Sequence, residues 1–469
     1  MNFIIIISDT LRRDHLGCYG NERISTPNID AFARQAIVFD RAYSASFPTV
    51  PHRRDLLTGR FTATYTRWAP LSPDEVVLAE ALATSGYTSM MVCDCPHVLE
   101  NGYHYDRGFD GFEWIRGQES DRWKTWPEAP EPPCDPAKIR GAEGLQKRHR
   151  RNVADWRYES DTFVARTMTT ACRWLEDNYR QERFFLYVDT FDPHEPWDAP
   201  QWYADMYDPG YTGEVVDYPL YSHVDFLTPA ELQHCRALYA AEVTLVDRWT
   251  GKLLKKIRDL GLLRNTMIIL TTDHGFLHGE HDIIGKSLIS ESAFSYIPLY
   301  EEINHIPFIL YYPGSEPRRS QAIIQPPDIM PTLLDLSETD DPGTIHGKSI
   351  ADVLQGKADQ HHDFAISMPY LGSDSCPVTV VKDRWTAILY SRRSSGKRVI
   401  DRAVDGYEKV QDTEQVANQD MLFDVVNDPA QTHDVQAEHG DIVEDLRSDL
   451  IHHLEKVGTN REFVNRWLA

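Results

Sequence analysis

The sequence predicts an α/β protein built on a large, mostly parallel sheet with helices on both faces. Short apolar runs alternate with helical segments through about residue 350, which is the pattern of a doubly wound sheet. Phe3 to Ile7 is one such run, and its β-branched composition is typical of a strand buried on both faces. Beyond about residue 360 the runs become short and turn-linked, which indicates a smaller C-terminal α+β subdomain.

Local signals place the individual elements. Thr26 and Pro27 are a typical N-cap and first helical residue. Further helices are expected at 76–83, 161–179, 228–260 and 441–457, and strands at 88–93, 184–188, 266–270, 306–312, 378–382, 385–390 and 398–400. The stretch 117–151 has little periodicity and is predicted to be an insertion or lid loop. We therefore expect a catalytic domain over 1–355, and a C-terminal subdomain with a small antiparallel sheet and a helix over 356–469.

Composition and charge narrow the class of partner. The formal net charge of −24 repels nucleic acid and anionic membranes, so neither is expected as a partner. An anion site in this chain needs local cations or a metal ion. The seven cysteines are scattered, without zinc-ribbon spacing or a disulfide framework, and the N-terminus lacks the features of a signal peptide. These features predict a cytoplasmic protein, and the chain is compatible with a homo-oligomeric assembly.

Polar residues follow several of the predicted strands. Asp9, Asp189 and the pair Asp273-His274 each come after an apolar run, and a further polar cluster occupies 49–53. A carboxylate in this position is most often a helix cap. Because the carboxyl ends of parallel strands meet at the edge where α/β proteins bind ligands, four such clusters together favour a functional site.

Several motifs that follow one another along the chain indicate a protein family. They are D-T-L-R-R-D-H-L-G-C-Y-G at 9–20, T-P-N-I-D at 26–30, L-T-G-R at 57–60, T-D-H-G at 272–275 with G-E-H at 279–281 and G-K at 285–286, D-I-M-P-T-L-L at 328–334, H-G-K-S at 346–349, and L-F-D with N-D-P at 422–429. Together they resemble the motifs of the sulfatase family within the alkaline phosphatase superfamily. The resemblance implies an α/β/α sandwich and a metal-dependent hydrolase of small-molecule sulfate, phosphate or phosphonate esters.

The resemblance also assigns roles to individual residues. It implies that Asp9, Asp273 and His274 ligate a divalent cation (Zn, Mn or Ca) and that Thr49, in the nucleophile position, also contacts the metal. Arg53 matches the arginine that steadies the nucleophile. The two remaining catalytic positions fall on His194, which protonates or positions the leaving group, and Lys286, which holds the oxygens of the anion.

Two departures from the family pattern bear on the mechanism. The family's D-D pair is Asp9-Thr10 here, and its C-x-P-S-R signature reads T-V-P-H-R. Thr49 cannot be oxidised to formylglycine, but it can attack as an alkoxide because a bound metal lowers the pKa of a hydroxyl group. Superfamily members with a threonine nucleophile include phosphodiesterases, phosphonoacetate hydrolases and phosphoethanolamine transferases. The first two of these classes use two zinc ions, so Thr49 shifts the expectation toward phosphate or phosphonate esters and toward a two-metal site.

The sequence allows two interpretations of the number of metal ions. Lys286 favours one metal, because a lysine cation beside a second metal is unfavourable. A two-metal site would draw on Asp189, Asp192 and His194, with a further histidine from His281, His305 or His346. The pairs His361-His362 and His452-His453 are expected on the surface of the C-terminal subdomain, with no role.

Two other functions remain as alternatives. One is a phosphoryl-type transferase, in which an alcohol instead of water takes the group from Thr49. The known transferases of this kind have membrane spans, and no stretch here approaches the ~20 apolar residues of a span. The other is a non-catalytic pseudoenzyme that keeps only an anion-binding pocket.

Overall fold

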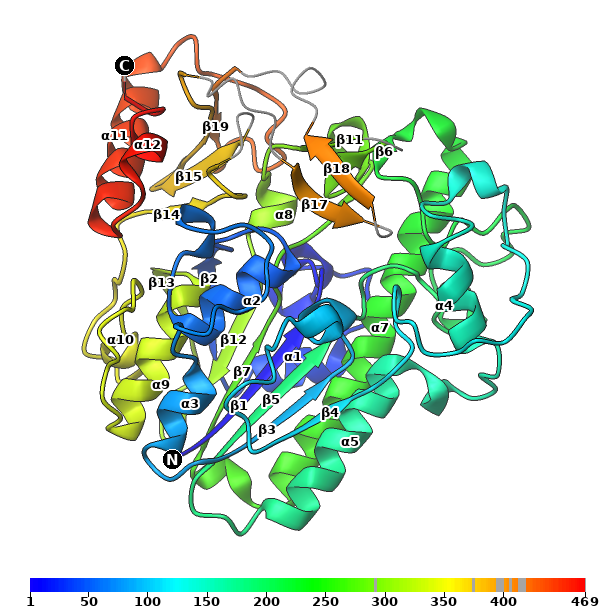
Figure 1. Ribbon diagram of the computed structural model, residues 1–469, viewed down its shortest axis with the longest axis horizontal. Helices are drawn as coiled ribbons and strands as arrows, with labels where there is room; N and C mark the ends of the chain where they lie inside the picture. Colours follow the sequence, from blue (N-terminus) through cyan, green and yellow to red (C-terminus); the bar gives the residue numbers. More distant parts are fainter. Residues whose placement is uncertain (291–292, 373–375, 394–399, 405–406, 412–418, 469) are drawn as a thin grey trace.

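A computed structural model describes residues 1–290, 293–372, 376–393, 400–404, 407–411 and 419–468. Its centre is an eight-stranded sheet in the order β13-β2-β12-β7-β1-β5-β3-β4 (Figure 1). The strands are β1 (Asn2–Ser8), β2 (Ile37–Ala42), β3 (Thr88–Cys93), β4 (Gly111–Trp114), β5 (Phe184–Thr190), β7 (Thr266–Thr271), β12 (Phe308–Tyr311) and β13 (Arg318–Ile324). Only β12 runs against its neighbours in this sheet, so the sheet is mixed but mostly parallel.

The side chains of β1 alternate between two apolar cores, one on each face of the sheet. Ile4 and Ile6 pack into the core under α1 (Pro27–Ala33), α5 (Phe163–Asn178) and α7 (Pro229–Asp259). Phe3, Ile5 and Ile7 pack into the core under α2 (Thr49–Thr58), α3 (Leu78–Ala83), α9 (Ile329–Ser337) and α10 (Ala351–Leu354). A strand covered on both faces has to be apolar at every position, which explains the unbroken run at the N-terminus.

A second, antiparallel sheet lies toward the C-terminus. It has the order β14-β15-β16-β19, with β14 (Ala365–Ser367), β15 (Val378–Lys382), β16 (Trp385–Leu389) and β19 (Met421–Asp424). The helices α11 (Gly440–Lys456) and α12 (Arg461–Val464) share an apolar core with it, and both lie beside β15 in Figure 1. This arrangement confirms the predicted fold class, an α/β/α sandwich with a smaller antiparallel C-terminal sheet.

Smaller elements connect these layers. One sheet joins β10 (Ser287–Ile289), β11 (Ala293–Tyr296), β18 (Tyr407–Gln411) and β17 (Ile400–Val404). Another joins β6 (Ser222–His223), β9 (Ile283–Gly285) and β8 (Leu277–His278). Two short helices, α6 (Gln201–Ala204) and α8 (Glu301–Asn304), follow β5 and β11 in the chain. The predicted strand at 398–400 overlaps β17 at Ile400, and its first two residues lie outside the described ranges.

The stretch 117–151 is not loop throughout. It contains a 3₁₀ turn at Pro136–Lys138 and most of α4 (Leu145–Val153). The sequence signal for α4 is weak because the helix is dominated by basic and polar residues, which do not form an apolar stripe of helical period. In Figure 1, α4 lies toward the right-hand side of the molecule.

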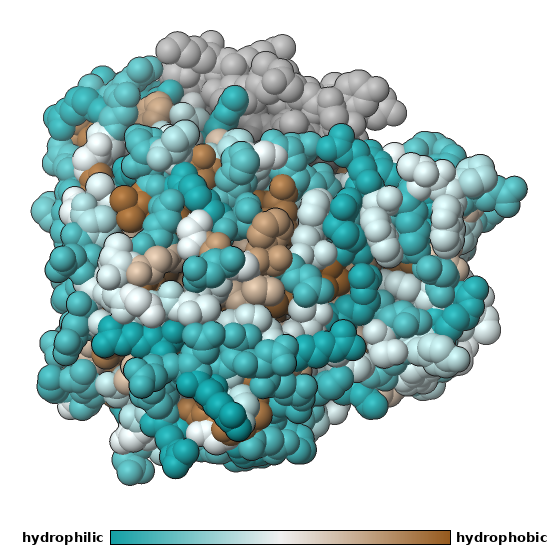
Figure 2. Space-filling view, turned by 60° about the horizontal axis from the view of Figure 1, so that its bottom comes forward, coloured by the Kyte–Doolittle hydropathy of each residue, from teal (hydrophilic) through white to brown (hydrophobic). Residues whose placement is uncertain are grey.

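The surface of the molecule is mostly hydrophilic in the view of Figure 2. Hydrophilic residues cover most of the face shown in Figure 2, and apolar residues there lie in small separate groups. Within the described ranges, no helix combines the length and the apolar character that a membrane crossing requires.

The partly buried His453 makes a pH-dependent contribution to stability. Its ring packs edge-on against Phe61 at 4.4 Å, and Nε2 is buried without a hydrogen-bond partner among the described residues. Burial, assisted by the nearby His346 and His362, lowers the pKa of His453 to about 3. An unfolded histidine has a pKa of about 6.5, so the stability is complete above that pH and falls as the pH drops from 6.5 toward 3.

We expect the free energy of unfolding to fall by about 2 kcal/mol between pH 7 and pH 5 through His453 alone. His453→Gln should remove that part of the pH dependence in urea denaturation. The exposed neighbour on the same helix supplies the control, because His452→Gln should leave the pH dependence as in the wild type. Equal pH dependence in His453→Gln and the wild type would show that His453 is protonated in the folded protein.

Candidate functional site

The register of β1 and β7 places the predicted acidic residues side by side at the same edge of the sheet. Ile7 of β1 pairs with Thr271 of β7, so Asp9 and Asp273, each two residues further along, lie beside each other. The backbone there is fixed by cross-strand hydrogen bonds, with Thr272 Oγ1 donating to Ser8 O at 2.6 Å. All three site positions that follow these strands, Asp9, Asp273 and His274, have no exposed surface.

Asp9, Asp273 and His274 form a group that can hold a metal ion. One ligand atom from each lies within 4.8 Å of the other two. His274 Nδ1 lies 2.8 Å from the carbonyl oxygen of Gly275, and donation of the Nδ1 proton to this oxygen leaves Nε2 as the ligand atom. Burial lowers the pKa of His274 to about 3, so the ring is neutral, as a metal ligand must be. The structure therefore brings together the three ligands that the motifs indicate.

The environment of Asp9 tests whether a cation fits here. Neither carboxylate oxygen has a hydrogen-bond partner among the described residues, although Arg53 Nη1 lies 2.9 Å from Oδ2. Burial and the charge of Asp273 raise the pKa of Asp9 well above its ordinary value. Arg53 is shared with Asp189 and Asp273, so a further cation would stabilise the ionised form of the two neighbouring carboxylates. The donor set, two carboxylates and an imidazole, therefore fits a divalent metal.

Thr10 replaces the second aspartate of the family pattern and contributes its backbone. Its N–H donates to Asp273 Oδ1 at 3.1 Å, and its carbonyl oxygen accepts from Tyr239 at 2.7 Å. The φ angle of +56° is unusual for a β-branched residue. Such strain persists where surrounding contacts impose it, which is common at functional sites.

Arg53 joins the carboxylates to the nucleophile position. Its Nε and Nη2 bind Asp189 as a pair, at 3.0 and 2.8 Å, while Nη1 contacts both Asp9 and Asp273. Nη1 also donates to the carbonyl oxygen of Thr49 at 3.3 Å. Arg53 thus contacts three buried carboxylates and the backbone of Thr49 at once.

Thr49 is the first residue of α2, and all ten residues of this helix are buried. Residues three and four apart share a helix face, so Thr49, His52 and Arg53 lie on one side of α2. Since Arg53 reaches the carboxylates from this side, Thr49 is on the face of the helix directed toward the ligand group.

Lys286 supplies the second cation of the site. It lies between β9 and β10 and is buried, with Nζ 2.9 Å from His194 Nε2 and 3.3 Å from His274 Nε2. His194 Nδ1 is 2.6 Å from the carbonyl oxygen of Glu195, so Nε2 is the acceptor from Lys286. Burial and the charge of Lys286 lower the pKa of His194 well below its ordinary value. His194 is therefore neutral, and its Nε2 faces the amine of Lys286.

The insertion supports His194 through a network that the sequence did not reveal. Glu195 Oε2 lies 3.2 Å from His194 Nδ1, and Glu195 Oε1 contacts Arg140 at 3.1 Å. Arg140 also contacts Glu119 at 3.1 Å, and His97 contacts the other oxygen of Glu119 at 2.7 Å. Glu119 and Arg140 come from the aperiodic stretch 117–151, where no motif marks them.

His52 is the second group that sequence reasoning did not assign. It replaces the serine of the family signature, has no exposed surface, and neither ring nitrogen has a hydrogen-bond partner in the described part of the chain. Burial lowers its pKa to about 3, so the ring is neutral. A neutral imidazole on the Thr49 face of α2 can donate one hydrogen bond to a bound anion.

The residues considered for a second metal are not gathered into one group. Asp189 binds Arg53, and Asp192 accepts from Gln118 at 2.7 Å and from the Val164 N–H at 3.0 Å. The three further histidines are engaged elsewhere: His281 stacks on Tyr300, His305 contacts Glu301 and the carbonyl of Asp40, and His346 accepts from the Phe61 N–H.

Comparisons with known proteins agree with this geometry. The chain matches the family model "Sulfatase" over residues 1–339 and the model "N-sulphoglucosamine sulphohydrolase, C-terminal" over residues 292–412. It is 24% identical over 437 residues to an arylsulfatase of Clostridium perfringens, covering 81% of this chain and 84% of the relative. It is 27% identical over 423 residues to an ulvan-active sulfatase of Formosa agariphila, covering 87% and 76%.

A solved structure shares the fold over nearly the whole length. The phosphonate monoester hydrolase of Agrobacterium radiobacter superposes with a TM-score of 0.74 at 18% identity, covering 97% of this chain and 96% of that one. The first family model spans well over half of the sequence, including every residue of the ligand group. The chain therefore belongs to the sulfatase family.

Proposed function

We propose that this protein is a metal-dependent hydrolase that cleaves esters of phosphate, phosphonate or sulfate with Thr49 as the nucleophile. The observation that carries the proposal is the group Asp9, Asp273 and His274, joined through Arg53 to the first turn of α2. Lys286 supports it as the buried cation beside His274. We propose one divalent cation (Zn, Mn or Ca) at this group.

A bound divalent cation would lower the pKa of a nearby hydroxyl group and offset negative charge on the transferred group. Asp9, Asp273 and His274 would hold it. Arg53 fixes the backbone of Thr49, and Lys286 holds the oxygens of the substrate anion against the repulsion of an acidic protein. Positioning and charge compensation account for most of catalysis in reactions of this type.

The reaction proceeds in two displacements. In the first, Thr49 Oγ1 loses its proton and attacks phosphorus or sulfur. A bond from Oγ1 forms, the bond to the leaving oxygen breaks, and the leaving group takes a proton from the ammonium of Lys286, which His194 holds in place. In the second, water attacks the same atom and the bond to Oγ1 breaks. The two protons of the water restore the Thr49 hydroxyl and the ammonium of Lys286, and the proton that Thr49 lost in the first step has passed to solvent.

Thr49 favours phosphorus over sulfur as the substrate atom. The relatives named arylsulfatase and ulvan-active sulfatase support a sulfate ester, and the phosphonate monoester hydrolase supports a phosphorus ester. A threonine cannot form the formylglycine hydrate, which expels sulfate by elimination, so water has to cleave a Thr49 ester instead. We therefore propose phosphate diesters or phosphonate monoesters as the preferred class.

The test is hydrolysis of four 4-nitrophenyl esters: the sulfate, the phosphate monoester, the phosphate diester and the phosphonate monoester. Protein loaded with Zn, Mn or Ca is compared with protein stripped by a chelator. We expect the phosphorus esters to be hydrolysed fastest, with activity lost on stripping and restored by metal. Binding of the esters without turnover would overturn the proposal in favour of a pseudoenzyme, and turnover that requires an added alcohol would overturn it in favour of a transferase.

A further inference from the structure

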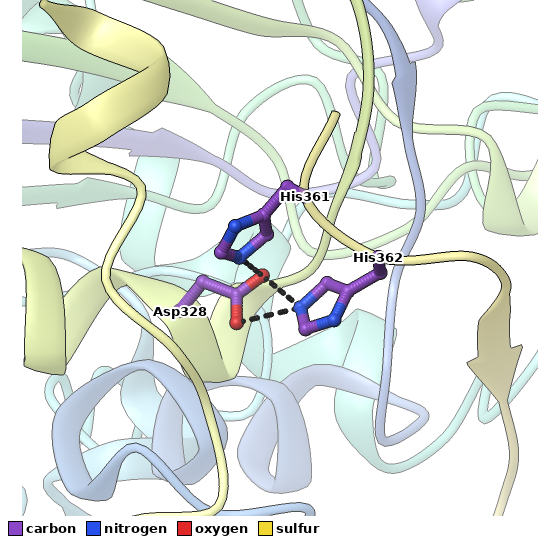
Figure 3. A group of neighbouring side chains, drawn as sticks. All are labelled: Asp328, His361 and His362. Carbon is purple, nitrogen blue, oxygen red and sulfur yellow. Dashed lines mark hydrogen bonds and ion pairs between the residues drawn. The ribbon is translucent and has the colours of Figure 1, made fainter. Parts of the chain in front are cut away.

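A second group of potential metal ligands lies away from the site described above. It consists of Asp328, His361 and His362, and one ligand atom from each lies within 4.8 Å of the other two. Figure 3 shows both imidazoles turned toward the carboxylate of Asp328. The expectation that the His361-His362 pair is a surface feature is wrong for His361, whose side chain is 2% exposed.

Two backbone N–H groups hold the carboxylate of Asp328 in position. Asp328 ends the short turn Pro326–Asp328 that precedes α9. Its Oδ2 accepts from the Gln325 N–H at 2.9 Å, and its Oδ1 accepts from the Lys348 N–H, also at 2.9 Å. Each carboxylate oxygen has two lone pairs, so each keeps one for a further partner. Such supporting hydrogen bonds are what hold a carboxylate ligand in place in metal sites.

The two histidines approach from the segment that leads into the C-terminal sheet. His362 forms a backbone bridge with Ile323 of β13, which holds the segment against the main sheet. The distances from Asp328 are 2.9 Å to His362 Nε2 and 3.4 Å to His361 Nε2. In tetrahedral zinc with ligands at about 2.0–2.1 Å, neighbouring ligand atoms are about 3.3 Å apart. The 3.4 Å between Asp328 and His361 Nε2 matches this value, and the 2.9 Å to His362 Nε2 is somewhat shorter.

Hydrogen bonding alone does not satisfy this cluster. Asp328 and His362 are within hydrogen-bond distance, but the buried Nε2 of His361 has no hydrogen-bond partner in the described ranges. If both rings were protonated, two cations would lie with ring centroids 4.2 Å apart. One cation bound by both Nε2 atoms and the carboxylate satisfies all three groups without that repulsion.

One ligand of the cluster, His362, is reached from solvent. His362 lines a surface pocket of about 530 Å³ whose wall carries four carboxylates: Asp359, Asp363, Asp383 and Asp449. Two cationic side chains, Arg41 and Lys382, also line it, and Lys382 is paired with Asp449 at 2.7 Å. The excess of carboxylates favours the approach of a divalent cation.

We propose that Asp328, His361 and His362 bind a divalent transition metal of the zinc type. Two imidazoles and one carboxylate are the ligands that zinc prefers, and water from the pocket completes the coordination. The three ligands come from the start of α9 and from the segment between α10 and β14. Bound metal would therefore link the start of α9 to the segment that leads into the C-terminal sheet.

Zinc content measured by plasma mass spectrometry tests the site. Asp273→Asn removes a ligand of the first group, so any zinc that this variant retains reports on the second. We expect Asp273→Asn to retain one equivalent after equilibration with zinc and gel filtration. Adding His361→Gln and His362→Gln should remove it. The exposed histidines His433 and His452 give the control, since replacing both with Gln should leave one equivalent bound.

The outcomes separate this site from the proposed function. Loss of one zinc equivalent from His361→Gln/His362→Gln, with ester hydrolysis retained, supports the second site whether or not Thr49 is the nucleophile. No zinc in Asp273→Asn, or one equivalent remaining after both histidines are replaced, overturns it. Should the double variant fail to fold, anomalous diffraction at the zinc edge from the unaltered protein decides. A peak among the three residues is expected, and its absence at saturating zinc overturns the proposal.

Discussion

Asp273→Ala is expected to abolish ester hydrolysis and to remove one equivalent of metal. Asp273 accepts hydrogen bonds at Oδ1 from the N–H groups of Thr10 and His274, and at Oδ2 it contacts Arg53. Asp273 thus fixes the backbone after β1 and the neighbouring metal ligand, His274. Loss of a ligand and of this preorganised charge should lower kcat/KM by on the order of 10³-fold or more.

Steady-state kinetics and metal analysis on the same preparation check this result. Asp259, an exposed aspartate at the end of α7, provides the control, and Asp259→Ala should keep both the activity and the metal. Full activity in Asp273→Ala would mean that the group Asp9, Asp273 and His274 is not the catalytic centre. Zinc at Asp328 is unaffected by this change, so the two metal sites are counted separately.

Arg53→Ala is expected to cause the largest loss of stability. Arg53 is 1% exposed and pairs with Asp9, Asp189 and Asp273, whose side chains are all fully buried. Its removal leaves three buried carboxylates without their common partner. Breaking a buried ion pair in this way costs about 3–5 kcal/mol, which urea denaturation of the metal-free protein should show.

Two further measurements separate electrostatics from lost packing. Arg53→Lys keeps the charge but not the paired hydrogen bonds to Asp189, so it should be intermediate. Adding zinc should recover part of the stability of Arg53→Ala, because a cation at Asp9 and Asp273 compensates the same charges. Arg34→Ala, at an exposed position after α1, should change stability by less than about 0.5 kcal/mol. An Arg53→Ala variant as stable as Arg34→Ala would contradict this view of the site.

Much of the fold follows from local patterns in the sequence. The strand at 88–93 has the predicted bounds, and the helices at 161–179 and 228–260 differ from α5 and α7 by one or two residues at each end. The two helices have long apolar periodicity, and α7 also has a capping box at Thr228 and Glu231. The reversed direction of β12 was not predictable, because a continuous apolar run shows burial on both faces but not the direction of the chain.

The candidate site, like the fold, is predicted by local sequence patterns only in part. Asp9, Asp273 and His274 end buried strands, so their convergence follows from parallel pairing in register. The network of Glu119, Arg140 and Glu195 depends on how an aperiodic insertion folds back, which no local signal encodes. His361 lies in a polar segment that reads as surface. Its side chain is 2% exposed, and its neighbour His362 bridges to Ile323 of β13, a contact between residues far apart in the sequence.

The rate of ester hydrolysis by Thr49→Ala decides whether the Thr49 hydroxyl is the nucleophile. The measurement uses metal-loaded protein and the best 4-nitrophenyl ester, with wild type and Thr49→Ser alongside. We predict that kcat falls by on the order of 10³-fold or more in Thr49→Ala, whereas Thr49→Ser, which keeps a hydroxyl, retains measurable turnover. Hydrolysis by Thr49→Ala at the wild-type rate would contradict the account and would mean that water attacks the ester directly.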